Sequence, residues 1–473
     1  MPIILLSTLL FIILLSLIKP FKHVKVPASG HVQEPLINQE KAIESLQKAL
    51  QFPTVSYEDI ALEDDQAFKD FQAYLLKRYP FIKEKGTVEI VDDRGILITL
   101  KGKDDTKPVV LMSHYDVVPV NGTWQEDPFS GTIINGRIYG RGALDTKGTL
   151  ISICEAFDDY FKTHDTLQTT TYLAFGGDEE VRGASAIKMR DMIHQRHPHL
   201  SFVLDEGGAV TKDIFPGVKA PVALVGLGEK GFMSVTLTAH DKGGHASTPA
   251  PETAITILAQ AIRILNRKNL FKARYTDVVK ALFEGLYPYS TDFKIRYVFG
   301  HFFFFKGLIK RIILRKGGTL PAMMRTTQAF TMMNGSEAMN VLPTRATLGI
   351  NYRLITGEHS DRVMEKLKHA LRKLPVEVSC EFKTEATSIS SLEGPYLTLK
   401  NTIEKTWQDV ITVPYLMVAA TDARHYHAVS DHVYRFSAQQ MFKEELSMIH
   451  SVDESIKVEH YLECVQFYRQ LIA

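Results

Sequence analysis

Cysteine is scarce in this chain: Cys154, Cys380 and Cys464 are the only three in 473 residues, and they lie far apart. An odd, dispersed set excludes a disulfide framework and a zinc-binding cysteine cluster. The chain also lacks an excess of either charge, because 55 Lys and Arg residues oppose 54 Asp and Glu residues. Since the net charge is only +1, no overall field attracts nucleic acid, and we expect no nucleic-acid partner.

Internal repeats and low-complexity tracts are also absent, although 473 residues exceed what one ordinary core accommodates. Strands alternating with helices from residue 40 to about residue 227 predict a mostly parallel α/β domain. Near Gly228 the pattern changes to strands whose apolar residues alternate with polar ones. This change predicts a separate α+β domain inserted into the first, after which the chain returns to the first domain.

One long apolar run stands at the start of the chain, over residues 3–18, followed by Lys19, Lys22 and Lys25. A membrane span needs roughly 20 apolar residues, so the run is marginal in length. The lysines on its C-terminal side favour an uncleaved membrane anchor. The alternatives are a cleaved signal, with residues 27–30 as a weak cleavage site, and a buried helix. The expected location is therefore membrane-anchored or, after cleavage, secreted or lumenal.

Residues 271–327 fit neither domain pattern, because phenylalanines at 302–305 and apolar residues at 308–314 stand among basic ones. We expect this segment to form a helical core of the inserted domain. The alternative is an apolar surface rimmed by basic residues, suited to acyl chains or a membrane.

Three apolar runs in the first half of the chain end in potential metal ligands. Residues 108–113 lead to His114 and Asp116, residues 169–175 lead to Asp178-Glu179-Glu180, and residues 201–204 lead to Asp205-Glu206. Runs without polar alternation are typical of strands covered on both faces, and functional groups gather at the carboxyl ends of such strands. A fourth acid, Asp145, lies in a glycine-rich turn over residues 140–148.

Histidine and several carboxylates at one sheet edge predict a site for two divalent ions, which can activate water and polarise a carbonyl group. His114 suits a terminal ligand, Asp116 suits its orientation, and Asp145 suits a bridge. Of Glu179 and Glu180, repulsion raises the proton affinity of the one that is not bound to metal, so one becomes a ligand and the other a general base. Each motif taken alone has a plainer explanation: a chance His-x-Asp, or a solvated acidic turn.

Together the motifs resemble the metallopeptidase family that contains aminoacylase, carboxypeptidase S, glutamate carboxypeptidase and succinyl-diaminopimelate desuccinylase. The matching segments are residues 113–119, 140–148, 177–181, 204–208, 244–247 and 340–343, which follow the order of the family over residues 40–473. Residues 204–208 and 421–425 are most similar to the branch of carboxypeptidase S and the N-fatty-acyl-amino-acid synthase/hydrolase.

The resemblance implies a role for each site residue. Terminal metal ligands are His114, Glu180, one acid of the Asp205-Glu206 pair and a C-terminal histidine, with Asp145 as the bridge; Asp116 orients His114 and Glu179 is the general base. Asp205 is the first choice for the paired acid and Glu206 the second. Among His425, His427, His432 and His450, the first choice is His450, because residues 449–454 resemble the motif of the family; His432 is the reserve.

The resemblance also implies residues that act on the substrate. His245 would reach the carbonyl oxyanion in the site of a partner subunit, in a homodimer made through the inserted domain. Arg353 and Arg424 are candidates to hold a substrate α-carboxylate, and each could equally form a structural ion pair. Asn340, in the motif over residues 340–343, is a further substrate-binding candidate.

The implied protein is a two-metal hydrolase, with zinc as the expected ion, that cleaves the C-terminal amide of a peptide or an N-acyl amino acid. Glu179 would deprotonate a metal-bound water, and the resulting hydroxide would attack the carbonyl. The aromatic residues at 299–314 favour long acyl chains. The alternatives are an inactive, membrane-tethered binding protein on the same scaffold and, less favoured, a metallophosphatase.

The implied architecture is an α/β catalytic domain with a ferredoxin-like insertion. We expect an anchor or signal over residues 1–20, a linker over 21–38, the catalytic domain over 39–227 and 385–473, and an inserted lid or dimerisation domain over 228–384.

Overall fold

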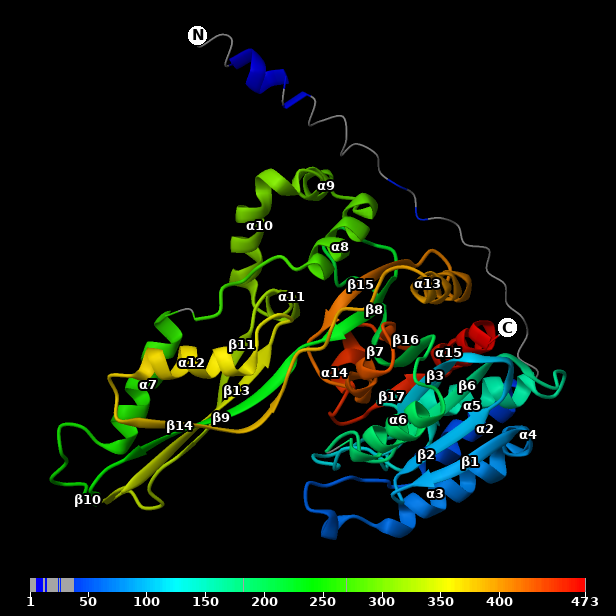
Figure 1. Cartoon of the computed structure of the whole chain (residues 1–473), viewed down its shortest axis with the longest axis horizontal. Helices are drawn as coiled ribbons and strands as arrows, with labels where there is room; N and C mark the ends of the chain where they lie inside the picture. The colour runs from blue at the N-terminus through cyan, green and yellow to red at the C-terminus, as the bar shows by residue number, and fades with distance from the viewer. Residues whose placement is uncertain are drawn as a thin grey trace.

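The structure is a computed structural model that describes residues 38–472 except residues 182 and 269, together with residues 6–11, 13, 14, 24 and 26. Figure 1 shows a larger lobe around an eight-stranded sheet and an elongated smaller lobe around a four-stranded sheet. The chain builds part of the larger lobe, crosses to the smaller lobe and returns. The predicted fold class, a mostly parallel α/β domain with a smaller sheet domain, is confirmed.

Eight strands form the large sheet: β1 (Gly86–Val91), β2 (Gly95–Leu100), β3 (Gly102–His114), β6 (Leu167–Gly176), β7 (Phe202–Thr211), β8 (Val222–Glu229), β15 (Ile411–Met417) and β16 (Val433–Gln440). Their order is β1-β2-β6-β3-β7-β16-β8-β15. β6, β3, β7 and β16 pair in parallel at the centre, as do β8 and β15, whereas β1 and β2 are antiparallel. The carboxyl ends of the central strands therefore open on the same edge.

Helices cover both faces of this sheet. One face packs against α2 (Gln39–Leu50), α3 (Asp65–Arg78), α4 (Pro80–Lys85), α5 (Lys147–Tyr160), α13 (Pro395–Thr406) and α15 (Val458–Ile472), and the other against α6 (Ala184–Arg196) and the 3-10 segment η3 (Asp422–Ala428). In β3, Leu111 belongs to the first cluster, and Val110 and Met112 belong to the second. Burial on both faces explains why these strands show no polar alternation.

The smaller lobe has a hydrophobic core of its own. Its antiparallel sheet has the order β11 (Thr327–Asn334), β13 (Arg345–Leu354), β9 (Gly231–His240) and β14 (Val376–Thr384), and its helices are α7 (Ala254–Lys268) and α12 (Ser360–Leu371). Buried and partly exposed residues alternate along β9 and β13 because only one face of the sheet is covered by helices.

Residues 277–322 correct one interpretation of the sequence. They form α8 (Asp277–Leu286), η2 (Tyr287–Tyr289), α9 (Phe293–Gly300), α10 (Phe302–Lys316) and α11 (Thr319–Ala322). Their buried residues, including Leu282 and Ile309, join the core of the large sheet beside β15, and not the core of the inserted domain. Apolar periodicity identifies a buried helix face but not the core against which it packs.

Short elements complete the chain: η1 (Ile60–Leu62), β4 (Ile133–Ile134), β5 (Arg137–Tyr139), β10 (Gly244–His245), β12 (Val341–Leu342), α14 (Lys443–Met448) and β17 (Ser455–Lys457). Most of the predicted anchor and linker, over residues 1–38, lies outside the described residues. Within the part of the chain that the structure describes, no helix is both long and apolar enough to cross a membrane.

The inserted domain offers a direct test of its core. Leu237 in β9 is fully buried. We expect Leu237→Ala to lower the free energy of unfolding by about 2–5 kcal/mol, because it removes buried methyl groups and leaves a cavity. Met332→Ala, at a residue 64% exposed on the edge strand β11, is the control and should change it by less than about 0.5 kcal/mol. Chemical denaturation measures both, and equal effects would contradict the assigned core.

Candidate metal centre

The buried carboxylate of Asp116, two residues beyond β3, connects three segments of the site. Its Oδ1 and Oδ2 accept hydrogen bonds from the backbone amides of Glu179 and Glu180, each at 3.1 Å. The Ser56 hydroxyl donates to Oδ2 at 2.9 Å, and His114 Nδ1 lies 3.4 Å from Oδ1. Asp116 therefore orients the His114 ring and the acidic turn after β6 together.

The turn that carries Asp145 is held by Glu454, a residue that sequence reasoning missed. Glu454 is fully buried, and its Oε1 accepts hydrogen bonds from the amides of Leu144 and Asp145 at 2.8 and 3.1 Å. Its Oε2 accepts a hydrogen bond from Arg141 at 2.7 Å. The only sequence signal was its place in the motif over residues 449–454, since a buried acid cannot be told from a surface acid by type alone.

Two histidines lie beside the two carboxylate oxygens of Asp145, one at each oxygen. His114 Nε2 lies 3.2 Å from Oδ1, and His450 Nε2 lies 3.0 Å from Oδ2. His450 Nε2 is also 3.1 Å from Glu180 Oε1. Hydrogen bonds to Asp145 and Glu180 raise the pKa of His450 to about 10. A carboxylate that offers one oxygen to each of two ligand groups has the arrangement expected of a bridge.

The other C-terminal histidines have different partners. His425 interacts with Arg424, His427 Nε2 lies 3.2 Å from the guanidinium of Arg435, and His432 lies 3.2 Å from the Tyr434 hydroxyl. The structure thus brings the first-choice histidine, and not the reserve, to the acidic residues.

The third predicted strand ending is a bulge within a longer strand. β7 continues to Thr211, but its pairing with β3 stops at Leu204. Its register with β16 shifts between Asp205 and Gly208, which leaves Glu206 and Gly207 as the extra residues. Gly207 has φ of 139°, a conformation that L side chains rarely adopt. A bulge of this kind turns a side chain toward a new direction.

The bulge separates the two acids of the pair. The Oε1 of Glu206 lies 3.4 Å from His114 Nε2. Both oxygens of Asp205 accept backbone hydrogen bonds, from the amides of Glu206 and Ala423, each at 2.8 Å. The geometry therefore places Glu206, the second choice from the sequence, beside the histidine, and gives Asp205 a role in holding the loop that leads into η3.

Buried negative charge is concentrated in this site. Burial, followed by the charge of Glu206, raises the pKa of Glu179 well above its usual value. Burial, with Asp145 and Asp205 adding to it against the opposing charge of His114, likewise raises the pKa of Glu206 well above its usual value. Bound cations would offset the repulsion among these buried carboxylates.

The donor set fits divalent cations. Two overlapping sets, His114–Asp145–Glu180 and His114–Glu179–Glu206, each place their ligand atoms within 4.8 Å of one another. Imidazole nitrogens and carboxylate oxygens are ligands that zinc accepts.

Two guanidinium groups, one from each domain, lie close enough for their charges to interact. Arg353 of β13 stacks over the Phe232 ring at 4.9 Å, and Arg424 donates to the Thr421 carbonyl at 3.2 Å. Burial, followed by the charge of Arg424, lowers the pKa of Arg353. Among the described residues, neither arginine has a carboxylate oxygen within 4.0 Å, although the charge of Glu229 acts on Arg353 and that of Asp422 on Arg424.

His245 and Asn340 lie away from these groups, at the tip of the inserted domain. β10, which contains His245, is at the far end of the smaller lobe in Figure 1. The Nδ1 atom of His245 accepts hydrogen bonds from the Ser247 amide and hydroxyl. The backbone carbonyl of Asn340 accepts a hydrogen bond from the Ala246 amide. The structure thus brings these two predicted residues together, but not into the metal centre of their own chain.

The fold and the site define a metal-dependent hydrolase, and comparison with known proteins identifies its family. The model of peptidase family M20/M25/M40 matches residues 110–473, and the chain belongs to this family. It is therefore an enzyme of the metallopeptidase and amidohydrolase type. The inactive binding-protein alternative is not favoured.

The curated relatives fall in the branch that the sequence indicated. The chain is 32% identical to a probable carboxypeptidase S-like 2 of Dictyostelium discoideum over 90% of this chain and 83% of that protein. It is 31% identical to N-fatty-acyl-amino acid synthase/hydrolase PM20D1.1 of Danio rerio, over 92% of this chain and 85% of that protein.

A solved structure supports the fold. An M20 family metallo-carboxypeptidase from Sulfolobus solfataricus superposes with a TM-score of 0.67 at 19% identity, over 92% of this chain and 98% of that one.

The contrast between Glu206 and Asp205 predicts different metal contents. We expect Glu206→Gln to weaken binding of one of two ions by more than about tenfold, because a charged ligand atom is replaced by a neutral amide. Asp205→Asn, the matched control, should retain both ions and lower thermal stability, since it disturbs two backbone hydrogen bonds. Metal analysis after dialysis against a weak chelator measures the stoichiometry; the reverse pattern would make Asp205 the ligand.

Proposed function

We propose that the chain is a zinc-dependent amidohydrolase that cleaves an amide bond next to a free carboxylate, in an N-acyl amino acid or at the end of a peptide. The observation that carries the proposal is the placement of Asp145 between His114 and His450, with Glu180 and Glu206 beside them. In this proposal Glu206 takes the ligand position first given to Asp205.

Two zinc ions bound there would supply positive charge to polarise the scissile carbonyl and to make water acidic. His114, Asp145 and Glu206 would hold one ion, and Asp145, Glu180 and His450 the other. The protein contributes the alignment: Asp116 fixes the His114 ring, and Glu454 fixes the Asp145 turn.

Glu179 would transfer a proton from the attacking water to the leaving amine. Its backbone amide donates to Asp116, and a carboxylate oxygen of Glu179 lies within 4.8 Å of ligand atoms of His114 and Glu206. In this proposal Glu179 binds neither ion. It can therefore accept a proton from water in the site and then return it to the leaving amine nitrogen.

Arg353 and Arg424 would bind the free carboxylate of the substrate. Since neither guanidinium has a described carboxylate within ion-pair distance, the two would form an anion site, and a bidentate contact would fix the amide relative to the metals. The location of Arg353 on the inserted domain and of Arg424 in η3 would let one substrate contact both domains.

His245, with Asn340 beside it, would serve the site of a partner subunit in a homodimer. Their position at the tip of the inserted domain supports this, because the exposed β10 lies at the far end of the smaller lobe, away from the described metal-ligand candidates of its own chain. The imidazole would donate to the oxygen of the carbonyl as negative charge develops on it.

The base assignment is tested by Glu179→Gln. We expect it to retain both metal ions while turnover falls by at least about 100-fold, because the amide cannot accept the proton. Metal analysis and single-turnover hydrolysis, measured on the same sample, separate the two effects. Hydrolysis near that of the parent would remove Glu179 from the mechanism.

The partner-subunit role of His245 predicts complementation. His245→Asn and Glu179→Gln should each be nearly inactive alone. Subunits dissociated, mixed and reassembled should recover about a quarter of the parent activity, because half of the dimers are mixed and each mixed dimer has one intact site. No recovery, with mixed dimers shown by mass spectrometry, would contradict a role in trans.

The substrate class is tested with N-oleoyl-phenylalanine and a benzyloxycarbonyl dipeptide. The names of the relatives include both an N-fatty-acyl-amino acid hydrolase and a carboxypeptidase S-like protein. We expect the acyl amino acid to have the higher kcat/KM, and Arg353→Gln to raise KM for both, since both carry the free carboxylate. Hydrolysis of neither would reject the proposed reaction.

A further inference from the structure

An exposed apolar stripe runs along α10. The helix buries Ile309 and Ile313 and packs Phe302 and Phe305 against the core of the large sheet. Its opposite face leaves Phe303 73%, Phe304 70%, Leu308 52% and Ile312 49% exposed. The 304, 308 and 312 positions are four residues apart and so form one continuous row on the helix. The inner face holds the helix in place, so the outer row is a fixed feature of the surface.

Basic residues flank this stripe, and the sequence on either side of it contains no acidic residues. From Phe293 to Ser336 the sequence contains eight Lys and Arg residues and no Asp or Glu. Lys306, Arg311, Arg315 and Lys316 of α10 are exposed, and Lys306 lies over the Phe303 ring at 4.8 Å. The nearest acidic residues in sequence are Asp292, which caps α9, and Glu337. This concentration of charge contrasts with the net charge of +1 for the whole chain.

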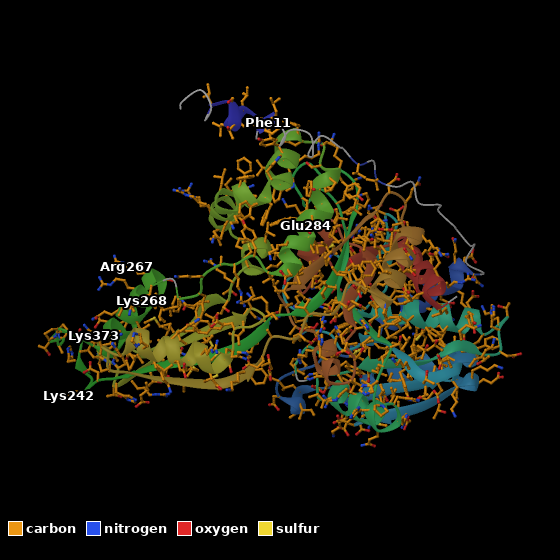
Figure 2. The ribbon with its side chains drawn as sticks, turned by 45° about the horizontal axis from the view of Figure 1, so that its top comes forward. Phe11, Lys242, Arg267, Lys268, Glu284 and Lys373 are labelled. Carbon is orange, nitrogen blue, oxygen red and sulfur yellow. The ribbon has the colours of Figure 1, made fainter. Side chains whose placement is uncertain are left out.

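The described residues near the N-terminus lie on the α9 and α10 side of the molecule. The Val24 amide donates to the Pro288 carbonyl at 3.2 Å, which ties the chain to η2, next to α9. Leu14 is ten residues before Val24 and, by covalent reach alone, lies within about 35 Å of it. The described apolar residues there are exposed, including Phe11 at 62%. Figures 1 and 2 show residues 6–11 on the side of the molecule where α9 and α10 lie.

We propose that α10 is a peripheral membrane-binding surface that inserts Phe303, Phe304, Leu308 and Ile312 into the interface of a bilayer containing anionic phospholipid. An amphipathic helix with aromatic and aliphatic residues on one side and basic residues around them binds in this way. The proposal is independent of the substrate class.

Other occupants fit these features less well. A second copy of the chain would bring the same basic residues against one another, which is unfavourable. An acyl chain of the substrate would need an enclosed groove, whereas the four apolar side chains are about half to three-quarters exposed.

The test is binding of the full-length protein to phosphatidylcholine vesicles with and without about 30% phosphatidylserine, followed by flotation. We expect binding to the anionic vesicles and a steep decrease with salt. The apolar variant combines Phe303→Ser, Phe304→Ser and Leu308→Ser, and the charge variant combines Lys306→Gln, Arg311→Gln and Arg315→Gln. We expect the apolar variant to bind at least about tenfold more weakly. We expect the charge variant to bind the anionic vesicles about 100-fold more weakly, with no change on phosphatidylcholine vesicles.

Two control variants carry substitutions of the same kind at exposed residues away from α10. Ile60→Ser with Leu62→Ser alters two residues that are 60% and 63% exposed in η1. A second control removes three charges at the end of the inserted domain, where Figure 2 places the residues, through Lys242→Gln, Arg267→Gln and Lys373→Gln. Both controls should bind vesicles like the parent.

A second measurement locates the contact. Phe304→Trp should show a blue-shifted emission and quenching by brominated lipid, and Leu397→Trp, at an exposed residue of α13, should show neither. Parent-like binding by the apolar and charge variants would assign all vesicle binding to the N-terminal segment and overturn the proposal, as would absence of binding by the parent. Self-association that these variants abolish, without vesicle binding, would make a second copy the occupant and overturn it as well.

Discussion

The site depends on one buried carboxylate, that of Asp116. A buried carboxylate is costly unless its oxygens are satisfied, and here a hydroxyl, two backbone amides and an imidazole surround it. Because the amides belong to Glu179 and Glu180, the same group that orients His114 also fixes the acidic turn. Asp116 therefore couples the position of His114, a proposed metal ligand, to the position of Glu179, the proposed base, so a shift of one would move the other.

The sheet and the segments around it bring the coupled residues together. β3 and β6 pair in parallel up to His114 and Gly176, so the two functional segments leave the sheet side by side. Glu454, far away in sequence, fixes the Asp145 turn, and the inserted domain supplies Arg353 from β13. The metal centre is thus assembled from segments that only the complete α/β domain brings together, whereas the inserted domain has a separate core.

Much of this organisation could be predicted from the sequence, because it rests on local patterns. The strands that lead to His114 and Asp178 show no polar alternation because both of their faces are covered, and the strands of the insertion alternate because one face is covered. The sequence motifs favoured Asp205 over Glu206, whereas the structure places Glu206 beside His114, because the direction of each side chain depends on a bulge in the pairing of β7 with β16. The role of Glu454 and the packing of α8 to α11 on the large sheet were missed because both are set by tertiary contacts and not by local periodicity.

In the proposed centre Asp145 would hold two ions, one together with Glu206 and His114 and the other together with Glu180 and His450. Crystals of the zinc-loaded protein, measured for anomalous scattering on both sides of the zinc absorption edge, test it directly. The account predicts two zinc peaks that share Asp145, one in contact with Glu206 and the other with His450. A single peak, or a peak bound by Asp205 with Glu206 turned away, would contradict it.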